Sequence, residues 1–458
     1  MNNRILVLIF LLGIPIFSQE IPVEFELFKR NNFQIDIGKS WKYNSTFGYN
    51  RFQNFENELF SSDTNYIYSR LGFNKFDNVN IIYGFSHFTF NKYLYTYLYS
   101  RIVNYPDLVD RYSGKPRDIS RFGFRSGEMD LGGIGFQNNW ITLQYGRGTQ
   151  SWGAGNGIQL AISHNSNPYD YGLFKFEIND FKFCYFHGFL ENYNENNRYL
   201  VGKGIEWNNR NDILLSLSEL VIYSGHGRPL DISYLNPISS HLEIELNDRQ
   251  NLLGTESGNA VWQFSLDYLM HSKIRISGNF LIDEFILDKI EKEQGKINGI
   301  AFSLRGSYLI SYPRFKMLAY SSFIHVGPHT FRHNGYNNFV NRNSPLGWKW
   351  GSDTEEFRVG VELFKFKKFN YAFVVGRRNS GQGNILSTPY TAYDNYEGGA
   401  FPSGLVNEVD FMDFSLNYWI WKRLSFYNKI VIEKSNLYGK NNAFKFGFDF
   451  YFETLNTI

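Results

Sequence analysis

Hydrophobic and polar residues alternate with a period of two along much of the chain, most clearly near its end. One unbroken set of phenylalanines occupies every second position: Phe444, Phe446, Phe448, Phe450 and Phe452. Successive side chains of a β-strand point to opposite faces, so these rings share one face and the intervening lysine and aspartate share the other. The pattern predicts a strand with lipid on one side and water on the other.

The same alternation recurs at 262–268, 300–310, 357–363 and 412–420. Between 79 and 90 the apolar positions change phase, because Val79 to Phe85 follow the odd positions whereas Phe88 and Phe90 follow the even ones. A phase change of this kind predicts a β-bulge near Ser86. Strands of this type fit either a soluble β-protein or a membrane barrel, since alternation alone does not say which face is outside.

The connections between the predicted strands are of two kinds. Short ones lie at 366–368 and 422–423, and long ones rich in Asn, Gly, Tyr and Pro lie at 94–118, 325–353 and 376–410. Short periplasmic turns and long outer loops are typical of transmembrane barrels. We therefore expect an all-β fold, an antiparallel transmembrane β-barrel of roughly 16 to 18 strands with long extracellular loops, in one domain over residues 19–458.

The N-terminal segment predicts export. Arg4 precedes an apolar run from Ile5 to Phe17, and Ser18-Gln19 follows as a small-residue cleavage site. This order is typical of a secretory signal peptide, here residues 1–18. No later segment has the length of apolar sequence that a membrane helix needs, so a closed barrel is the remaining way to span lipid. We expect a Gram-negative outer-membrane location.

Composition and charge narrow the range of possible functions. The chain has 45 Phe, 32 Tyr and 9 Trp, and a formal net charge of +2. A near-neutral balance does not support nucleic acid as a partner. The single cysteine, Cys184, lies in an aromatic-rich stretch, which favours a packed, inert thiol. No cofactor motif is present, and nothing resembles the nucleophile elbow of a hydrolase, so we do not expect an enzyme.

The segment from Gly146 to Gly157 contains five glycines in twelve residues. It is not a phosphate-binding loop, because the residues after it predict a strand rather than a helix. Its chemistry leaves two interpretations, a turn that folds into the lumen or a sugar site. In the second, the Trp152 ring stacks on a pyranose, and the hydrogen-bonding groups come from Gln150, Asn156, His164 and Asn165.

Two other clusters carry weaker signals. His325, His329 and His333 recur every fourth residue, which on a helix would suggest a metal site. The Gly327-Pro328 pair predicts a loop, and therefore surface histidines. The charged stretch 283–293 predicts a solvated hairpin extension and lacks the ligand pattern of a calcium loop. We predict no metal site.

The glycine-rich segment also resembles a known family. The run Thr149-Gln150-Ser151-Trp152-Gly153-Ala154-Gly155, and then 160–168, is similar to the capsule-assembly Wzi family, whose pattern is Trp-Gly-Pro-Gly, an apolar strand and a Ser-Asn-Asn-Ala-x-Pro-like turn. Segments 233–237 and 345–353 are also similar. The chain departs from the family in having Ala154 in place of a proline, and in lacking an evident N-terminal helical bundle, since 21–39 read as extended.

The resemblance implies an outer-membrane barrel that binds exported polysaccharide and helps to attach capsule to the cell surface without catalysis. The partners it implies are surface polysaccharide and outer-membrane lipid, together with the barrel-insertion machinery during biogenesis. The alternative is a porin or substrate-specific channel, because roughly 16 or more strands enclose a lumen wide enough for solutes unless loops fill it.

Overall fold

The computed structural model describes residues 45–47, 66–90, 93–109, 112–138, 140–251, 258–283, 289–312, 315–365, 369–392, 399–421 and 424–454. The signal peptide expected at 1–18, the segment 21–39 and Phe452's side chain lie outside the described part. No helix in the described ranges is long and apolar enough to cross a membrane.

Eighteen strands form one continuous sheet. They are β1 (Tyr66–Phe76), β2 (Val79–Phe90), β3 (Leu94–Val103), β4 (Ser126–Gln137), β5 (Ile141–Gly148), β6 (Tyr169–Ile178), β7 (Phe181–Tyr193), β8 (Asn196–Asn208), β9 (Ile213–His226), β10 (Asn259–His271), β11 (Ile274–Ile282), β12 (Ile300–Ser311), β13 (Lys316–Val326), β16 (Thr354–Lys365), β17 (Phe369–Ser380), β18 (Asn407–Trp421), β19 (Leu424–Ser435) and β20 (Gly439–Thr454). A separate hairpin, β14 (Val340–Asn341) and β15 (Ser344–Pro345), lies in a loop. The short helices include α4 (Ile232–Leu235), α5 (His241–Leu246) and α6 (Lys289–Glu293).

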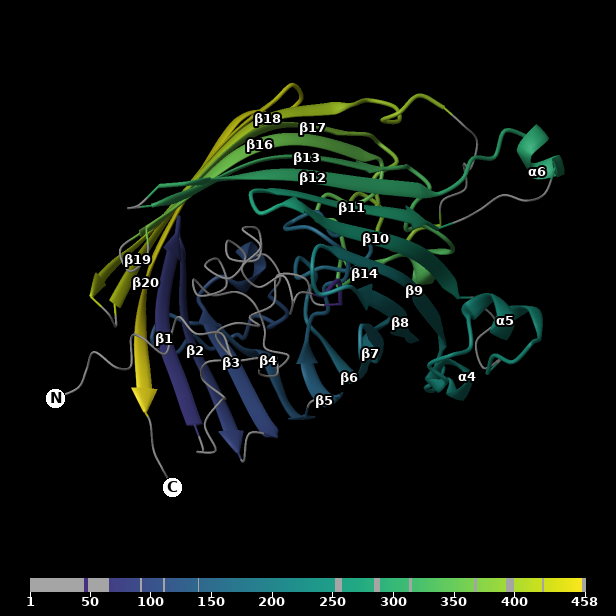
Figure 1. The fold of residues 1–458 in the computed structure, drawn as a ribbon, viewed down its shortest axis with the longest axis horizontal. Helices are drawn as coiled ribbons and strands as arrows, with labels where there is room; N and C mark the ends of the chain where they lie inside the picture. The colour runs from purple at the N-terminus through teal and green to yellow at the C-terminus, as the bar shows by residue number, and fades with distance from the viewer. Residues whose placement is uncertain are drawn as a thin grey trace.

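Each barrel strand pairs antiparallel with the next, and β1 pairs with β20 from Ile67↔Thr454 to Phe76↔Lys445. The sheet is therefore closed into a barrel, as Figure 1 shows. Closure satisfies the backbone groups that would otherwise be left at two sheet edges. The predicted fold class is confirmed, and the strand number is even and within the predicted range.

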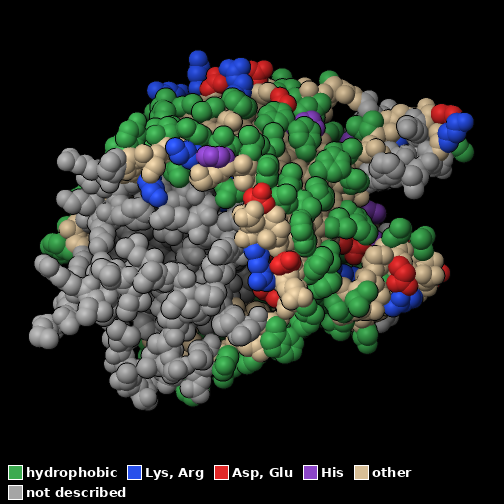
Figure 2. Space-filling view, in the orientation of Figure 1, with side chains coloured by type: hydrophobic (Ala, Val, Ile, Leu, Met, Phe, Trp, Pro, Cys, Tyr) green, Lys and Arg blue, Asp and Glu red, His purple; other side chains and the backbone are tan. Residues whose placement is uncertain are grey.

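The two faces of the barrel wall differ as the alternation predicted. Large apolar residues are exposed on the outside, among them Phe264, Phe302, Leu304, Phe357, Met412, Phe444 and Phe450. Polar residues face the lumen, among them Gln144, Gln263, Asp267, Arg275, Asn279, Arg305 and Arg378. This arrangement is the inverse of a soluble barrel and matches a wall between lipid and a polar interior. Figure 2 shows the hydrophobic side chains as a broad area on one outer face.

The long connections all lie at one end of the barrel, hereafter the long-loop end. They are 104–125, 149–168, 227–258, 283–299, 327–353 and 381–406, whereas the opposite end has connections of two to four residues. The long loop predicted at 94–118 was wrong in its first part, because 94–103 is β3. In that strand, Tyr95, Tyr97 and Tyr99 point inward, so both faces carry apolar or aromatic residues and the alternation is hidden.

The bulge predicted near Ser86 was also wrong. β2 pairs without interruption with both β1 and β3, and Ser86 lies opposite Ser69 and Leu98. The phase change instead reflects the interior of the barrel, where His87 and Thr89 continue the buried face that Val79 begins. Register shifts occur elsewhere, for example between Phe189 and Glu191 at the long-loop end of β7.

Three long loops fold inward and fill part of the lumen. We call loops 149–168 and 327–353, with the described parts of loop 381–406 (381–392 and 399–406), the lumenal plug. Their apolar residues include Trp152, Leu160, Phe339, Leu346, Trp348 and Ile385, and these form one buried cluster with inward residues of β6 to β13. Cys184 of β7 is part of this cluster, as expected for a packed thiol. The plug therefore has a hydrophobic core of its own inside a polar lumen.

Two smaller expectations change. His329 is 2% exposed within the plug and is therefore not a surface histidine. Within the charged stretch 283–293, residues 289–293 form the short helix α6 instead of a hairpin, and 284–288 lie outside the described residues.

Candidate carbohydrate-binding site

The glycine-rich segment crosses the lumen instead of capping it. From the end of β5 it reaches Asn279 on β11, whose side chain accepts from Ala154 N at 2.7 Å and donates to Ala154 O at 2.9 Å. Further along, Ser303 of β12 donates to Ile158 O at 2.8 Å, and the guanidinium of Arg358 on β16 donates to Gly157 O. Of the two interpretations of this segment, the structure shows the turn that folds into the lumen.

The five predicted sugar-binding residues are divided between the core and the surface of the plug. Gln150 and Trp152 are fully buried, and the Trp152 ring lies 4.7 Å from Phe47 and 5.1 Å from Phe186 between ring centroids. Asn156, His164 and Asn165 are partly exposed. His164 lies beside Thr149, with 2.9 Å between Nδ1 and Oγ1, whereas Asn156 lies across the lumen at Arg305.

These positions do not form a single pocket around Trp152. A sugar could stack on the Trp152 ring only if the ring left its packing against Phe47 and Phe186. The indole Nε1 of Trp152 is buried and has no hydrogen-bond partner within the described ranges. The direct binding role of the five residues stays a prediction.

The loops of the plug are tied together by backbone and amide contacts. Ser163 N donates to Leu346 O and Trp348 N donates to Leu160 O, each at 2.8 Å. Asn341 Nδ2 donates to Asn167 O at 2.9 Å, and Asn167 Nδ2 donates back to Asn341 O at 3.3 Å. The segments 160–168 and 341–348 are therefore neighbours in space.

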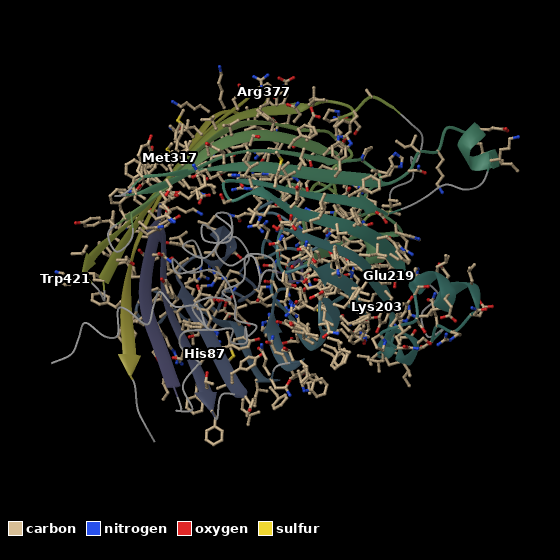
Figure 3. The ribbon with its side chains drawn as sticks, viewed as in Figure 1. His87, Lys203, Glu219, Met317, Arg377 and Trp421 are labelled. Carbon is tan, nitrogen blue, oxygen red and sulfur yellow. The ribbon has the colours of Figure 1, made fainter. Side chains whose placement is uncertain are left out.

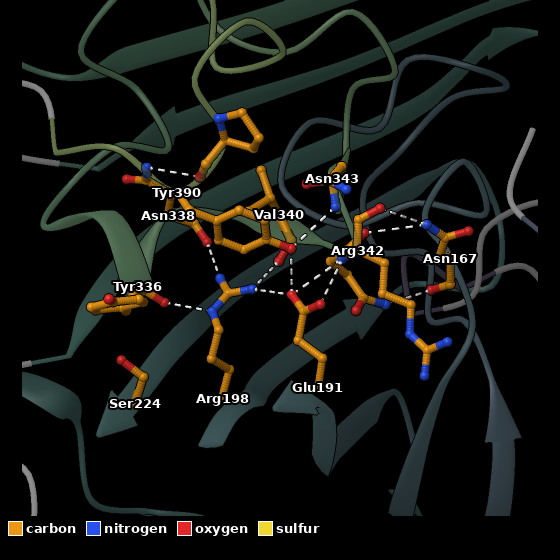
Figure 4. A network of polar contacts seen from close by, with 12 residues as sticks. Asn167, Glu191, Arg198, Ser224, Tyr336, Asn338, Val340, Arg342, Asn343 and Tyr390 are labelled. Atoms are coloured by element: carbon orange, nitrogen blue, oxygen red, sulfur yellow. Dashed lines mark hydrogen bonds and ion pairs between the residues drawn. The ribbon is translucent and has the colours of Figure 1, made fainter. Parts of the chain in front are cut away.

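A buried ion pair organises the long-loop end of the plug (Figure 4). Arg198 of β8 is 0% exposed, and its Nη1 lies 2.6 Å from Glu191 Oε1 of β7. The same guanidinium donates to the carbonyls of Tyr336, Asn338 and Val340 at 2.6, 2.6 and 2.9 Å. Planar guanidinium groups suit several acceptors at fixed angles, so one arginine fixes the course of loop 327–353 against the wall.

The carboxylate of Glu191 holds the other side of this network. It accepts from the Tyr390 hydroxyl at 2.7 Å and from Arg342 N at 3.1 and 3.2 Å. Burial, followed by the charge of Glu191, raises the pKa of the Tyr390 phenol, so Tyr390 stays protonated as the donor. Glu191 therefore connects loops 327–353 and 381–406 to the barrel.

Above this buried pair lies a group of side chains that we call the mouth cluster, formed by the half-exposed Tyr193, Tyr336, Arg342 and Tyr390 and by the exposed Asn343. The rings of Tyr193 and Tyr390 are stacked with centroids 3.7 Å apart, and Tyr336 lies 6.4 Å from Tyr193. Arg342 and Asn343 form the tip of the β14–β15 hairpin, both with positive φ (49° and 64°), as a two-residue type I′ turn requires.

The mouth cluster combines aromatic surface with hydrogen-bonding groups. Tyrosine rings offer an apolar face and a polar tip, and guanidinium and amide groups offer donors and an acceptor for hydroxyls. Because these side chains stand on a buried ion pair and a tight hairpin, little conformational entropy is lost when a ligand binds. The arrangement suits a ligand that has an apolar face and hydroxyl groups at its edge, such as a sugar ring.

Sequence reasoning missed the mouth cluster. Its members come from the end of β7 and from two long loops, which no local pattern brings together. The available signal was compositional, since both loops are rich in Asn, Gly and Tyr. Within the described ranges, no group of three or more His, Cys, Asp or Glu residues is placed to hold a metal ion.

No protein-family model and no curated protein matches the sequence. Among solved structures, the chain is similar to Wzi of Escherichia coli, an outer-membrane protein involved in group 1 capsule assembly and described as a carbohydrate-binding β-barrel. The TM-score is 0.62 at 11% identity, over 88% of this chain and 87% of Wzi. OprD of Pseudomonas aeruginosa gives a TM-score of 0.47 at 10% identity, over 86% of this chain and 96% of OprD. The likeness to Wzi shows a shared barrel fold.

Proposed function

We propose that this protein is an outer-membrane barrel that binds exported polysaccharide at its long-loop end and holds it at the cell surface without catalysis. The observation that carries the proposal is the mouth cluster, in which Tyr193, Tyr336 and Tyr390 stand half-exposed on the buried Arg198–Glu191 pair. The shared fold with Wzi and the sequence resemblance at 149–168 and 345–353 support the same role.

The proposed binding is adsorption to repeating sugar units. A tyrosine face covers the apolar side of a pyranose, while Arg342 and Asn343 exchange hydrogen bonds with its hydroxyls. Each unit binds weakly, and a long polymer gains avidity because a dissociated unit is replaced by its neighbour at high local concentration. The polysaccharide is thus retained although a single sugar leaves quickly.

The plug favours binding over transport. Loop 149–168 crosses the lumen and is held at β11, β12 and β16, so it obstructs the path that a solute would take. A porin or substrate-specific channel is the rival function, and single-channel conductance in a planar bilayer separates the two. A binding barrel with this plug should give little conductance, whereas sustained ohmic conductance would favour the channel.

The direct test is a pull-down of the host's own surface polysaccharide by purified protein. Tyr336→Ala and Tyr193→Ala remove aromatic surface from the mouth cluster, and we expect each to weaken binding about tenfold, as for removal of an aromatic anchor worth about 1.4 kcal/mol. Tyr438→Ala is the matched control, since Tyr438 is 82% exposed on the β19–β20 turn at the same end. Equal binding by all four proteins would refute a site at the mouth cluster.

A second experiment tests the cellular role. Deleting the gene in a strain that makes capsule or exopolysaccharide should release polymer into the medium without reducing its synthesis. Unchanged cell-attached polymer would count against the proposal even if the purified protein bound sugar. Mass spectrometry of the mature protein from outer-membrane fractions tests export together with removal of residues 1–18.

A further inference from the structure

The outer wall of β8 and β9 carries an ion pair close to apolar, outward-facing residues. Lys203 of β8 and Glu219 of β9 point outward and form an ion pair, with 3.6 Å between Nζ and Oε2. Their side chains are only 8% and 6% exposed (labelled in Figure 3). A charged pair on a lipid-facing wall is costly unless other groups cover it.

The covering groups come from loop 227–258. Its residues 230–249, which include α4 and α5 and which we call the outer cap, lie against the outside of these strands (Figure 1). His241 N donates to Glu219 Oε1 at 2.9 Å, and the Lys203 ammonium donates to Ser239 O. The cap thus supplies the remaining polar partners of the pair.

Aromatic stacking fixes the cap to the wall. The ring of Tyr234 in α4 stacks on Tyr223 of β9 at 4.6 Å, and Tyr223 stacks on Tyr199 of β8 at 4.8 Å. Tyr185 of β7 donates from its hydroxyl to Tyr234 O at 3.0 Å. The inner face of the cap is therefore a packed interface, and its opposite face points away from the barrel.

The cap also exposes many apolar side chains. Six aliphatic residues of the cap are exposed: Leu230 (45%), Ile232 (79%), Leu235 (40%), Ile238 (90%), Leu242 (56%) and Leu246 (73%). Figure 2 shows hydrophobic side chains on the visible face of this projection. A concentration of exposed aliphatic side chains in one short loop marks a contact surface, because soluble loops rarely leave such a patch in water.

The strand registers place the cap beside the lipid-facing wall. Glu219 lies opposite Lys203 and also opposite Trp262 of β10, whose ring is exposed on the outside. Two residues further toward the short-turn end, Phe264, Leu217 and Ile205 form a continuous outward row at 45%, 44% and 36% exposure. The cap therefore begins one row from an apolar band, at the level where Trp262 faces outward.

A groove continues the same surface on the other flank. It has a volume of about 480 Å³ and is lined mainly by apolar groups of the outer wall, including Ile134, Phe136, Leu143 and Phe174, with Leu235 of the cap at its edge. Gly172 places no side chain in the floor of the groove, and no atom lies within 4 Å of the place where its Cβ would be. Wall, groove and cap thus form one apolar surface.

We propose that the outer cap is an interfacial membrane anchor, whose exposed aliphatic residues lie among the lipid acyl chains beside the barrel and whose inner face shields the Lys203–Glu219 pair from lipid. Its polar residues Glu243 and Arg249 pair with each other, with 2.6 Å between Arg249 Nη1 and Glu243 Oε1, as suits the headgroup side of an amphipathic segment. This role goes beyond polysaccharide binding and does not depend on it.

Spin labels measure the immersion directly. In a Cys184→Ala background, single cysteines at Ile238 and Leu242 are labelled with a nitroxide and the protein is inserted into phospholipid vesicles. Leu217→Cys on β9 is the lipid-facing control, and Lys115→Cys in loop 104–125 is the aqueous control. Heat-modifiable migration on gels confirms that each labelled protein is folded.

We expect the labels at Ile238 and Leu242 to collide with oxygen and to avoid a water-soluble nickel chelate, as the label at Leu217 does. Collision ratios equal to that of Lys115 would overturn the anchor. Binding of polysaccharide by the same labelled proteins is measured separately, so a failed anchor and a failed mouth cluster give different results.

Discussion

A Cβ built on Gly347 would lie 1.8 Å from the carbonyl oxygen of Leu160, a separation that atoms in a folded protein do not reach. Gly347 and Leu160 belong to different loops of the plug, and the next residue, Trp348, donates its backbone N to that same oxygen at 2.8 Å. The two loops therefore meet through their backbones, and glycine is required at 347 for this close approach.

We expect Gly347→Ala to force loops 149–168 and 327–353 apart and to lower the free energy of unfolding by about 1–3 kcal/mol, as overpacking does in protein cores. Gly306→Ala is the matched control, because no atom lies within 4 Å of the corresponding Cβ on the outward face of β12. Urea unfolding in lipid vesicles, followed by tryptophan fluorescence, measures both. Equal midpoints would mean that the plug tolerates separation of its loops.

Arg198→Met should be more damaging. It removes the guanidinium but leaves the Glu191 carboxylate buried, and breaking a buried pair in this way costs about 3–5 kcal/mol. Arg377→Met removes an arginine whose partner is Asp410, in a pair that is 59% and 55% exposed, and we expect no measurable change. If the Arg198→Met variant were stable and bound polysaccharide normally, the mouth cluster would not depend on the Arg198–Glu191 pair.

Conductance tests whether loop 149–168 closes the lumen. Replacing Asn279 by Ala leaves the backbone groups of Ala154 without their partner on β11, at a cost of about 1–3 kcal/mol for buried unpaired groups. We expect more frequent opening events than in wild type, and steady conductance when 153–157 is deleted. Asn428→Ala on β19, far from loop 149–168 in the strand order, is the control. If the deletion variant conducted as little as wild type, a part of the protein other than 153–157 would block the lumen.

The outer cap should loosen in acid. The hydrogen bond from His241, which outweighs the effect of burial, lowers the pKa of Glu245 below its ordinary value of 4.5. A carboxyl group with a lowered pKa in the folded state contributes stability that is present above pH 4.5 and is lost as the pH falls through the folded pKa. The mobility of a nitroxide at Ile238 should therefore rise below pH 4.5.

Glu245→Gln is the control for that pH dependence, since glutamine does not titrate. The step in mobility should disappear in this variant. If the step persisted, another group would be responsible for it.

The barrel could be predicted from sequence because its rule is local. Phe444, Phe448 and Phe450 alternate with polar residues, and each does face outward, since the two-residue period is set by backbone geometry alone. The rule failed where one face was aromatic and the other largely aliphatic, as with Tyr95 and Leu98 of β3. It also failed where the interior itself changed from apolar to polar, as at His87.

The candidate site could not be read in the same way. Trp152 was a reasonable choice for sugar stacking by residue type, but its burial against Phe47 and Phe186 depends on contacts distant in sequence. Tyr193 and Tyr390 stack only because loop 381–406 returns over the end of β7. Side chains brought together by loop docking leave no periodic trace in the sequence, so composition is the remaining clue.

The seam between β1 and β20 has a consequence for biogenesis. Barrel strands otherwise join the neighbour that precedes or follows them in the chain, whereas this seam joins the first described strand to the last. Contacts between distant segments carry the largest loop-closure entropy and form slowly. During folding both edges therefore stay open to aggregation until the 16-residue strand β20 pairs with β1. The unfinished sheet therefore needs protection from aggregation until β20 pairs with β1.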